Sequence, residues 1–111
     1  MLEYGEIEKL ISRLVEERKR HMQATSVLEL CEIDRDKRRA EIGADEGIVT
    51  GKNAEIRKDQ LTVAVAQDAE HLRLLQRVAV CRQELGIADI EVEAARRRIS
   101  LTEAWLRSHG T

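Results

Sequence analysis

The sequence predicts an all-α protein whose chain forms a long antiparallel helical hairpin, coiled-coil-like, and assembles into an oligomeric helix bundle. Three observations lead to this prediction. Charged residues make up 36% of the 111 residues and proline is absent, so nothing in the chain forbids very long helices. Apolar residues recur three and four positions apart over two long stretches, as they do on one face of a helix. A glycine-rich break separates these stretches, and the length suits a single domain, 1–111.

The first helix is expected over residues 2–42. Two rows of residues repeat at intervals of seven, which is the pattern of a coiled-coil seam. One row contains Ile7, Leu14, His21 and Leu28, and the other contains Leu10, Glu17, Ala24 and Cys31. His21 and Glu17 are the polar members of an otherwise apolar seam.

A turn is expected at residues 43–53, which read GADEGIVTGKN. Gly43 can end the first helix, and Asn53 can cap the second by accepting a hydrogen bond from a backbone N–H, with Thr50 as the other candidate cap. Ile48, with the valine that follows it, is expected to fold back onto the helix ends.

Part of this turn, GIVTGKN, is similar to the start of a phosphate-binding loop. That loop requires G-x-x-x-x-G-K-[ST] after a buried strand. Here three residues separate Gly47 from Gly51, and Asn53 follows Lys52 where the magnesium-binding hydroxyl belongs. A helix, and not a strand, is expected before it. We therefore interpret the stretch as a turn and predict that it binds no nucleotide.

The second helix is expected over residues 54–108. Its seam has two heptad rows: Val78, Leu85, Val92, Ile99 and Leu106 in one, and Leu74, Cys81, Ala88, Ala95 and Thr102 in the other. A second apolar stripe lies on roughly the opposite side and contains Val80, Ile87, Ala94 and Leu101. A helix that is apolar on two faces is expected to be buried on both.

Closing the hairpin at 43–53 places opposite each other residues whose numbers add to about 95. Ile7 then lies opposite Ala88. Cys31 lies opposite Ala64, so the distance to Cys81 is roughly 25 Å of helix and the two thiols cannot form a bridge. The same register leaves residues 93–108 extending past the start of the first helix.

This overhang predicts self-association, with a homodimer as the expected form. The predicted interface contains Ile87, Val92, Ile99, Leu101, Trp105 and Leu106. Such uncovered apolar side chains would be stabilised by a second copy of the chain. An unidentified protein partner is also expected.

No group of side chains indicates catalysis, a cofactor or a metal, so an enzyme is not expected. The predicted register brings His21 and His71 together, and Glu17 and Glu70 lie nearby. A zinc site, however, needs three or four ligands at fixed geometry. The interpretation favoured here is that both histidines are polar seam residues that set the register. Cys31 and Cys81 are expected to be buried, reduced thiols.

Charge argues against nucleic acid and membranes as principal partners. The net charge is −2, and the chain has neither an apolar run long enough to span a bilayer nor a signal peptide at its start, so a cytoplasmic location is expected. Residues 34–39 mix acidic and basic side chains. Arg96, Arg97 and Arg98 form the cleaner basic cluster and are the candidate nucleic-acid contacts.

Residues 50–61, TGKNAEIRKDQL, resemble a motif of small all-helical proteins of bacteriophages and prophages. In that family the motif opens a long second helix that ends in an Arg-rich apolar segment, to which residues 95–101, ARRRISL, are similar. The resemblance covers the second half of the chain and implies no activity, cofactor or catalytic residue. It implies a protein encoded near phage replication and recombination genes.

Two functional hypotheses follow. The first is a non-enzymatic oligomeric protein, encoded by a phage or prophage, that acts by protein–protein interaction. The alternative is a nucleic-acid-binding accessory factor of phage replication or recombination that uses the Arg-rich end of the second helix.

Overall fold

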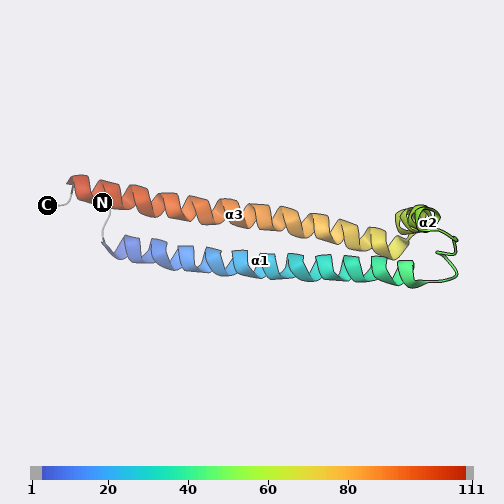
Figure 1. Cartoon of the computed structure of the whole chain (residues 1–111). Coiled ribbons are helices and arrows are strands. Elements are labelled where there is room, and N and C mark those ends of the chain that lie inside the picture. The colour runs from blue at the N-terminus through green and yellow to red at the C-terminus, as the bar shows by residue number, and fades with distance from the viewer. Residues whose placement is uncertain (1–3, 110–111) are drawn as a thin grey trace. The chain divides into compact units, whose positions relative to one another are not determined.

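The protein is all-α over residues 4–109, the part of the chain that the computed structural model describes (Figure 1). The helices are α1 (Tyr4–Ala44), α2 (Ala54–Gln67) and α3 (Ala69–His109). These residues form two compact units. The terminal unit pairs residues 4–26 of α1 with 83–109 of α3, and the corner unit contains residues 27–82. The expectation of a single domain over 1–111 stays a prediction.

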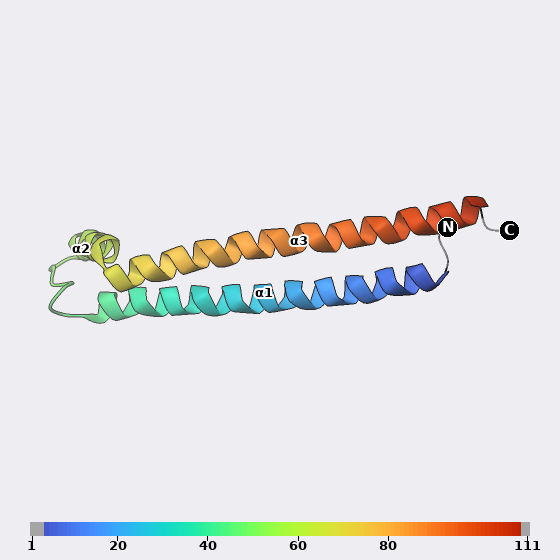
Figure 2. The same cartoon turned by 180° about the vertical axis from the view of Figure 1, so that it is seen from behind.

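Within each unit α1 and α3 lie side by side and run in opposite directions (Figures 1 and 2). The two predicted heptad seams are confirmed by burial. The buried positions are Glu17, Leu28, Cys31 and Ile42 on α1, and His71, Leu74, Val78, Cys81, Ala88, Ala95 and Thr102 on α3. The other predicted seam members are half-buried. The seam therefore follows the period of seven that the sequence shows.

The prediction of one uninterrupted helix over 54–108 is wrong, because the helix is broken at Asp68. This residue has an extended backbone, with φ −77° and ψ 118°. Its carboxylate oxygen Oδ2 accepts a hydrogen bond from the backbone N–H of His71, with a distance of 2.7 Å between nitrogen and oxygen. This bond satisfies one of the N–H groups left unpaired at the start of α3. As a result α2 turns away from the α1–α3 pair of the corner unit and is seen nearly along its axis in Figure 1.

The predicted register is also wrong. Cys31 contacts Cys81 in the corner unit, and His21 contacts Asp89 in the terminal unit, so the numbers of facing residues add to about 110–112 rather than 95. The reason is that α2 belongs to the connection, which moves the centre of the hairpin from about residue 48 to about residue 56. Residues after 93 therefore lie along the first turns of α1, and the predicted overhang is not present.

The loop between α1 and α2 uses its polar groups to build the start of α2. Asn53 is the N-cap, as predicted: its side-chain oxygen accepts the backbone N–H of Ile56 at 2.8 Å. The other candidate cap, Thr50, has a different role. The Gln60 side-chain oxygen accepts the backbone N–H of Thr50 at 3.0 Å and that of Gly51 at 2.8 Å. These two amides are therefore engaged within the loop.

Close packing explains two other features of this loop. A Cβ on Gly51 would overlap the side chain of Ile56, so this position requires glycine. Ile48 lines a shallow apolar groove with Ile56 and Val63. Ile48 therefore folds back onto the flank of α2. The sequence had predicted that it would contact the helix ends. Helix α1 ends at Ala44, next to the predicted stop.

Candidate functional site

The main candidate site is an exposed apolar stripe on α3 of the terminal unit, here called the outer face. It contains Ile87, Ile90, Ala94, Leu101 and Trp105, whose spacing of three, four and seven keeps them on one side of the helix. Ile87 is 52% exposed, Ile90 69%, Leu101 71% and Trp105 37%. Contiguous exposed apolar surface on a soluble protein commonly marks a site of interaction.

The structure divides the six predicted interface residues into two groups. Ile87, Leu101 and Trp105 lie on the outer face. Val92, Ile99 and Leu106 are half-buried and belong to the seam with α1. The predicted overhang of residues 93–108 is absent, and the burial of Val92, Ile99 and Leu106 is explained within the chain.

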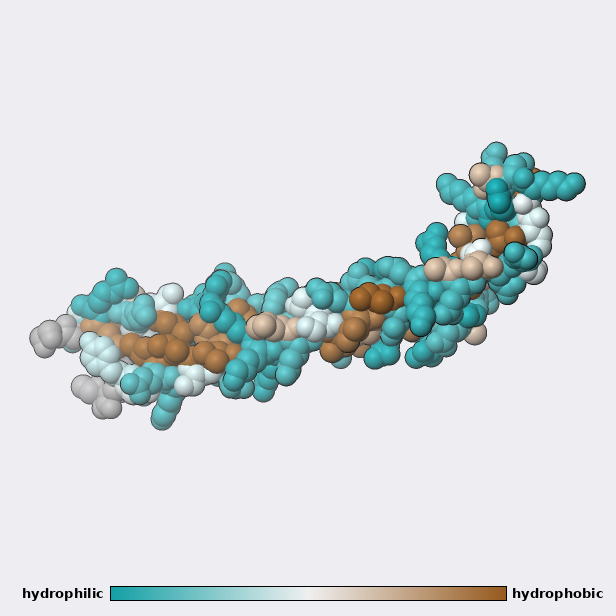
Figure 3. Space-filling model, turned by 60° about the horizontal axis from the view of Figure 1, so that its bottom comes forward, coloured by the Kyte–Doolittle hydropathy of each residue, from teal (hydrophilic) through white to brown (hydrophobic). Residues whose placement is uncertain are grey.

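Apolar side chains also gather on another part of the terminal unit. Figure 3 shows a band of apolar atoms between polar ones on one face of the terminal unit. On α1 of this unit the exposed large apolar residues are Tyr4, Ile11, Val15 and Met22. The unit therefore presents apolar surface from both of its helices.

An aromatic pair that was not predicted lies at one end of the outer face. The rings of Trp105 and His109 stack, with centroids 4.4 Å apart and planes inclined by 14°. His109 Nδ1 also lies 2.9 Å from the Trp105 carbonyl oxygen. These contacts hold the Trp105 ring in place, although its indole remains partly exposed. The spacing of four residues on a helix was the available signal.

Arg96, Arg97 and Arg98 are exposed on α3. Arg96 Nη1 lies 3.9 Å from Glu93, an exposed pair of the kind that contributes little to stability. Between residues 4 and 109 no ion pair involves Arg97 or Arg98. The three guanidinium groups are thus accessible, as the nucleic-acid hypothesis requires.

Arg98 shares a groove with residues of α1. The groove is lined by Arg13 and Arg20 of α1, by Arg98 of α3, and by the carboxylates of Glu17 and Glu91. Glu17 is buried in the seam, with one oxygen 3.6 Å from Arg20 Nη1. A protonated Glu91 can donate to Glu17, and this hydrogen bond with the adjacent negative charge raises the pKa of Glu91. The two acids offset most of the positive charge.

The two histidines proposed as seam residues are in different units. His21 contacts Asp89 in the terminal unit. His71 is buried at the start of α3 in the corner unit, and its Nδ1 has no hydrogen-bond partner there. The register error explains why the sequence placed them together. In the part of the chain that the structure describes, no group of three or more potential ligands is arranged to hold a metal ion.

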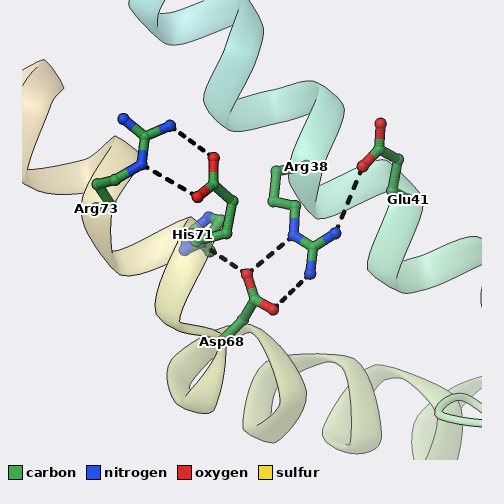
Figure 4. A network of polar contacts seen from close by, with 6 residues as sticks. Arg38, Glu41, Asp68, His71 and Arg73 are labelled. Atoms are coloured by element: carbon green, nitrogen blue, oxygen red, sulfur yellow. Dashed lines mark hydrogen bonds and ion pairs between the residues drawn. The ribbon is translucent and has the colours of Figure 1, made fainter.

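The corner unit contains a network of polar contacts around Asp68 (Figure 4). Arg38 of α1 donates two hydrogen bonds to Asp68, from Nε at 2.9 Å and from Nη2 at 2.6 Å. Together with the His71 amide, this guanidinium lowers the pKa of Asp68 to about 2. A second pair, Glu70 and Arg73, lies on α3 beside it. Because Asp68 joins the α2–α3 corner to α1, the network has a structural role.

The break at Asp68 was not predicted, although the sequence contains signals for it. Aspartate is a preferred N-cap, and Glu70 adds negative charge in the first turn of α3. The apolar heptad rows of α3 also stop at His71 when followed backwards, because Gln67 occupies the next seam position.

The two thiols, predicted to be far apart, are neighbours in the corner unit. The Sγ atoms of Cys31 and Cys81 lie 3.5 Å apart across the seam. Cys31 is 1% exposed and Cys81 6%. The prediction that both are buried is confirmed, and the prediction that they cannot form a bridge is contradicted by this distance.

No protein-family model matches the chain, and no curated protein or solved structure shows significant similarity to it. The similarity of residues 50–61 to a phage-protein motif therefore has no independent support. The chain is a small all-helical protein. No helix within residues 4–109 is both long enough and apolar enough to cross a membrane.

Proposed function

We propose that this protein is not an enzyme and that it acts by helix-mediated association, first with a second copy of itself and then with a protein partner. The exposure of the outer face carries this proposal. Three large residues of that face, Ile87, Ile90 and Leu101, each expose more than half of their surface although they lie at helical spacing on one helix. A seam with α1 already occupies the other side of α3, so only another chain can cover this one.

A homodimer is the simplest assembly that covers the outer face. A two-fold axis brings the same surface of both copies together, so a self-complementary stripe needs no second kind of site. Each large apolar side chain that passes from full exposure to full burial contributes about 1.5–3 kcal/mol. Ile87 and Leu101 are only partly exposed in the single chain, so burying each of them would contribute a correspondingly smaller free energy. Trp105 supplies the large, rigid aromatic surface that is enriched in interfaces.

The test is the molar mass of the full chain in solution, measured by light scattering. We expect a dimer for the wild type and a monomer for the Ile87→Asp/Leu101→Asp variant, because an unpaired carboxylate is costly to bury. Ser100→Asp is the matched control, since Ser100 is exposed next to Leu101 but lies outside the stripe. Circular dichroism should show the same helix content in all three proteins. A dimer that survives the double substitution would contradict this proposal.

Substitutions at Ile99 and Leu106 do not serve this purpose. Both residues lie in the seam with α1. Aspartate at these positions would disturb the hairpin itself, and a change in mass would then have two explanations.

A second proposal is binding to nucleic acid, and one observation favours it. Arg13 and Arg20 of α1 meet Arg98 of α3 around one groove, with Arg96 and Arg97 exposed nearby. Phosphate contacts of this kind release counterions, so affinity should fall steeply with salt. Replacing Arg96, Arg97 and Arg98 with glutamine should reduce both the affinity and the salt slope, whereas Arg57→Gln on α2 should change neither. Binding that does not depend on salt or on these arginines would contradict it.

A role in a phage or prophage programme, inside the bacterial cytoplasm, completes the first proposal. It rests on the similarity of residues 50–61 to the phage motif, together with the Arg-rich segment at 95–101. Expression of the gene on prophage induction would support this role, and unchanged expression would argue against it.

A further inference from the structure

We propose that Cys31 and Cys81 form a modification site, at which oxidation makes a reversible disulfide between α1 and α3. This inference is independent of the proposed self-association, because it concerns only the corner unit. Its basis is the 3.5 Å separation of the two Sγ atoms, which already lie in contact across the seam.

The geometry favours bond formation with little movement. A disulfide needs its sulfur atoms about 2.05 Å apart, so the gap has to close by roughly 1.5 Å. Both cysteines occupy heptad seam positions that face each other on antiparallel helices, and small side chains there allow the backbones to approach closely. Leu28 and Leu74 are buried in the same seam, on either side of the cysteine pair. The fold therefore holds the pair in place before any oxidant arrives.

The chemistry needs a disulfide oxidant, for which oxidised glutathione is the probe. One cysteine thiolate attacks a sulfur of the oxidant, which forms a mixed disulfide and releases one glutathione thiolate. The second cysteine then attacks the protein sulfur of the mixed disulfide and releases the second glutathione. Two protein thiols are oxidised and one glutathione disulfide is reduced to two thiols. Because Cys31 is 1% exposed, the first step requires transient opening of the seam.

The cross-link would change the behaviour of the corner unit. It closes the stretch 31–81, which contains the loop, α2 and the Asp68 corner. Closing a long stretch restricts the unfolded chain, so the oxidised protein should resist unfolding more than the reduced one. In a reducing compartment the thiols would persist, and oxidative stress would then convert the corner unit to its cross-linked state.

The test measures the dithiol–disulfide equilibrium of the full chain against glutathione, once in native buffer and once in denaturant. Samples reach equilibrium from both the reduced and the oxidised side, so slow access to buried thiols does not affect the result. Intact mass and non-reducing peptide mapping then identify the products. We expect loss of two hydrogen atoms, a peptide that links Cys31 to Cys81, and recovery of both thiols with dithiothreitol.

The decisive quantity is the effective concentration of the thiol pair in each condition. It should be at least about 100-fold higher in native buffer than in denaturant, and the oxidised protein should melt roughly 10 °C or more above the reduced one. Cys31→Ser and Cys81→Ser should each form no internal bond, and in denaturant each should carry at most a single glutathione. Equal or lower effective concentration in native buffer, cross-links between chains, or two glutathiones on the wild type would overturn the proposal.

Discussion

Asp68 shows how much a single side chain contributes to this fold. Its carboxylate caps α3 through the His71 amide and accepts two hydrogen bonds from Arg38. A bidentate guanidinium–carboxylate pair fixes direction as well as distance, which neither lysine nor a single hydrogen bond does. The residue therefore ends α2, starts α3 and fastens both to α1. At this scale one carboxylate determines the architecture of the corner unit.

The pKa of Asp68 gives this role a testable pH dependence. Its folded-state pKa of about 2 lies below the ordinary value of 3.8. The ionised carboxylate thus favours the folded state, and its contribution is complete above about pH 4 and is lost as the pH falls towards about 2. We expect Asp68→Asn to unfold at a lower temperature at neutral pH and to lose part of the acid sensitivity below pH 4 that the wild type shows.

Thermal unfolding followed by circular dichroism, at a series of pH values, measures this effect. Asp59→Asn is the matched control, because Asp59 is an exposed aspartate on α2. If both variants keep the acid sensitivity of the wild type, Asp68 does not have the proposed role.

At the scale of the helices, the sequence predicted the faces of α1 and α3 but not how they are aligned. Heptad spacing is a local property, so the seam from Ile7 to Cys31 on α1 was predicted directly from it. Register depends on where the chain reverses, and that was decided by one cap at Asp68. Ala54–Gln67 contains neither glycine nor proline, so nothing in it separates α2 from the helix that follows except the weaker signals at Gln67 and Asp68. Because the predicted register was wrong, long-range contacts such as Cys31–Cys81 were not predicted.

The same limit explains the outcome for the candidate site. The stripe through Ile87 and Leu101 was predicted correctly as a second apolar face, since its spacing is local. The assignment of Ile99 and Leu106 to an interface depended on the register, and so it inherited the error. The Arg38–Asp68 pair joins residues that are far apart in the sequence, so no local pattern predicts it.

Leu72 and Leu74 test which face of α3 is packed. Leu74 is 5% exposed and Leu72 52%. We expect Leu74→Ala to lower the free energy of unfolding by about 2–5 kcal/mol, because it leaves a cavity in the seam. Leu72→Ala should change it by about 0.5 kcal/mol or less. Denaturant unfolding of both variants measures the difference. Equal effects would show that the seam does not follow the predicted heptad.

For the whole molecule, the unequal use of apolar surface is the central feature. One face of α3 is covered by α1 in the seam, whereas the outer face of the terminal unit remains exposed. The net charge of −2 provides little electrostatic repulsion between copies. A chain with an accessible apolar stripe and almost no net charge is expected to associate. This expectation follows from the exposed residues and does not need the overhang that the first register suggested.

Sedimentation equilibrium of the wild-type chain over a wide range of concentrations tests this claim most directly. We expect a molar mass that rises with concentration and levels off at about twice that of one chain, as a closed two-fold dimer requires. Ser100→Asp should follow the same curve, and Ile87→Asp/Leu101→Asp should remain at the mass of one chain. A wild-type protein that sediments as a monomer at every concentration would show that the outer face does not mediate self-association.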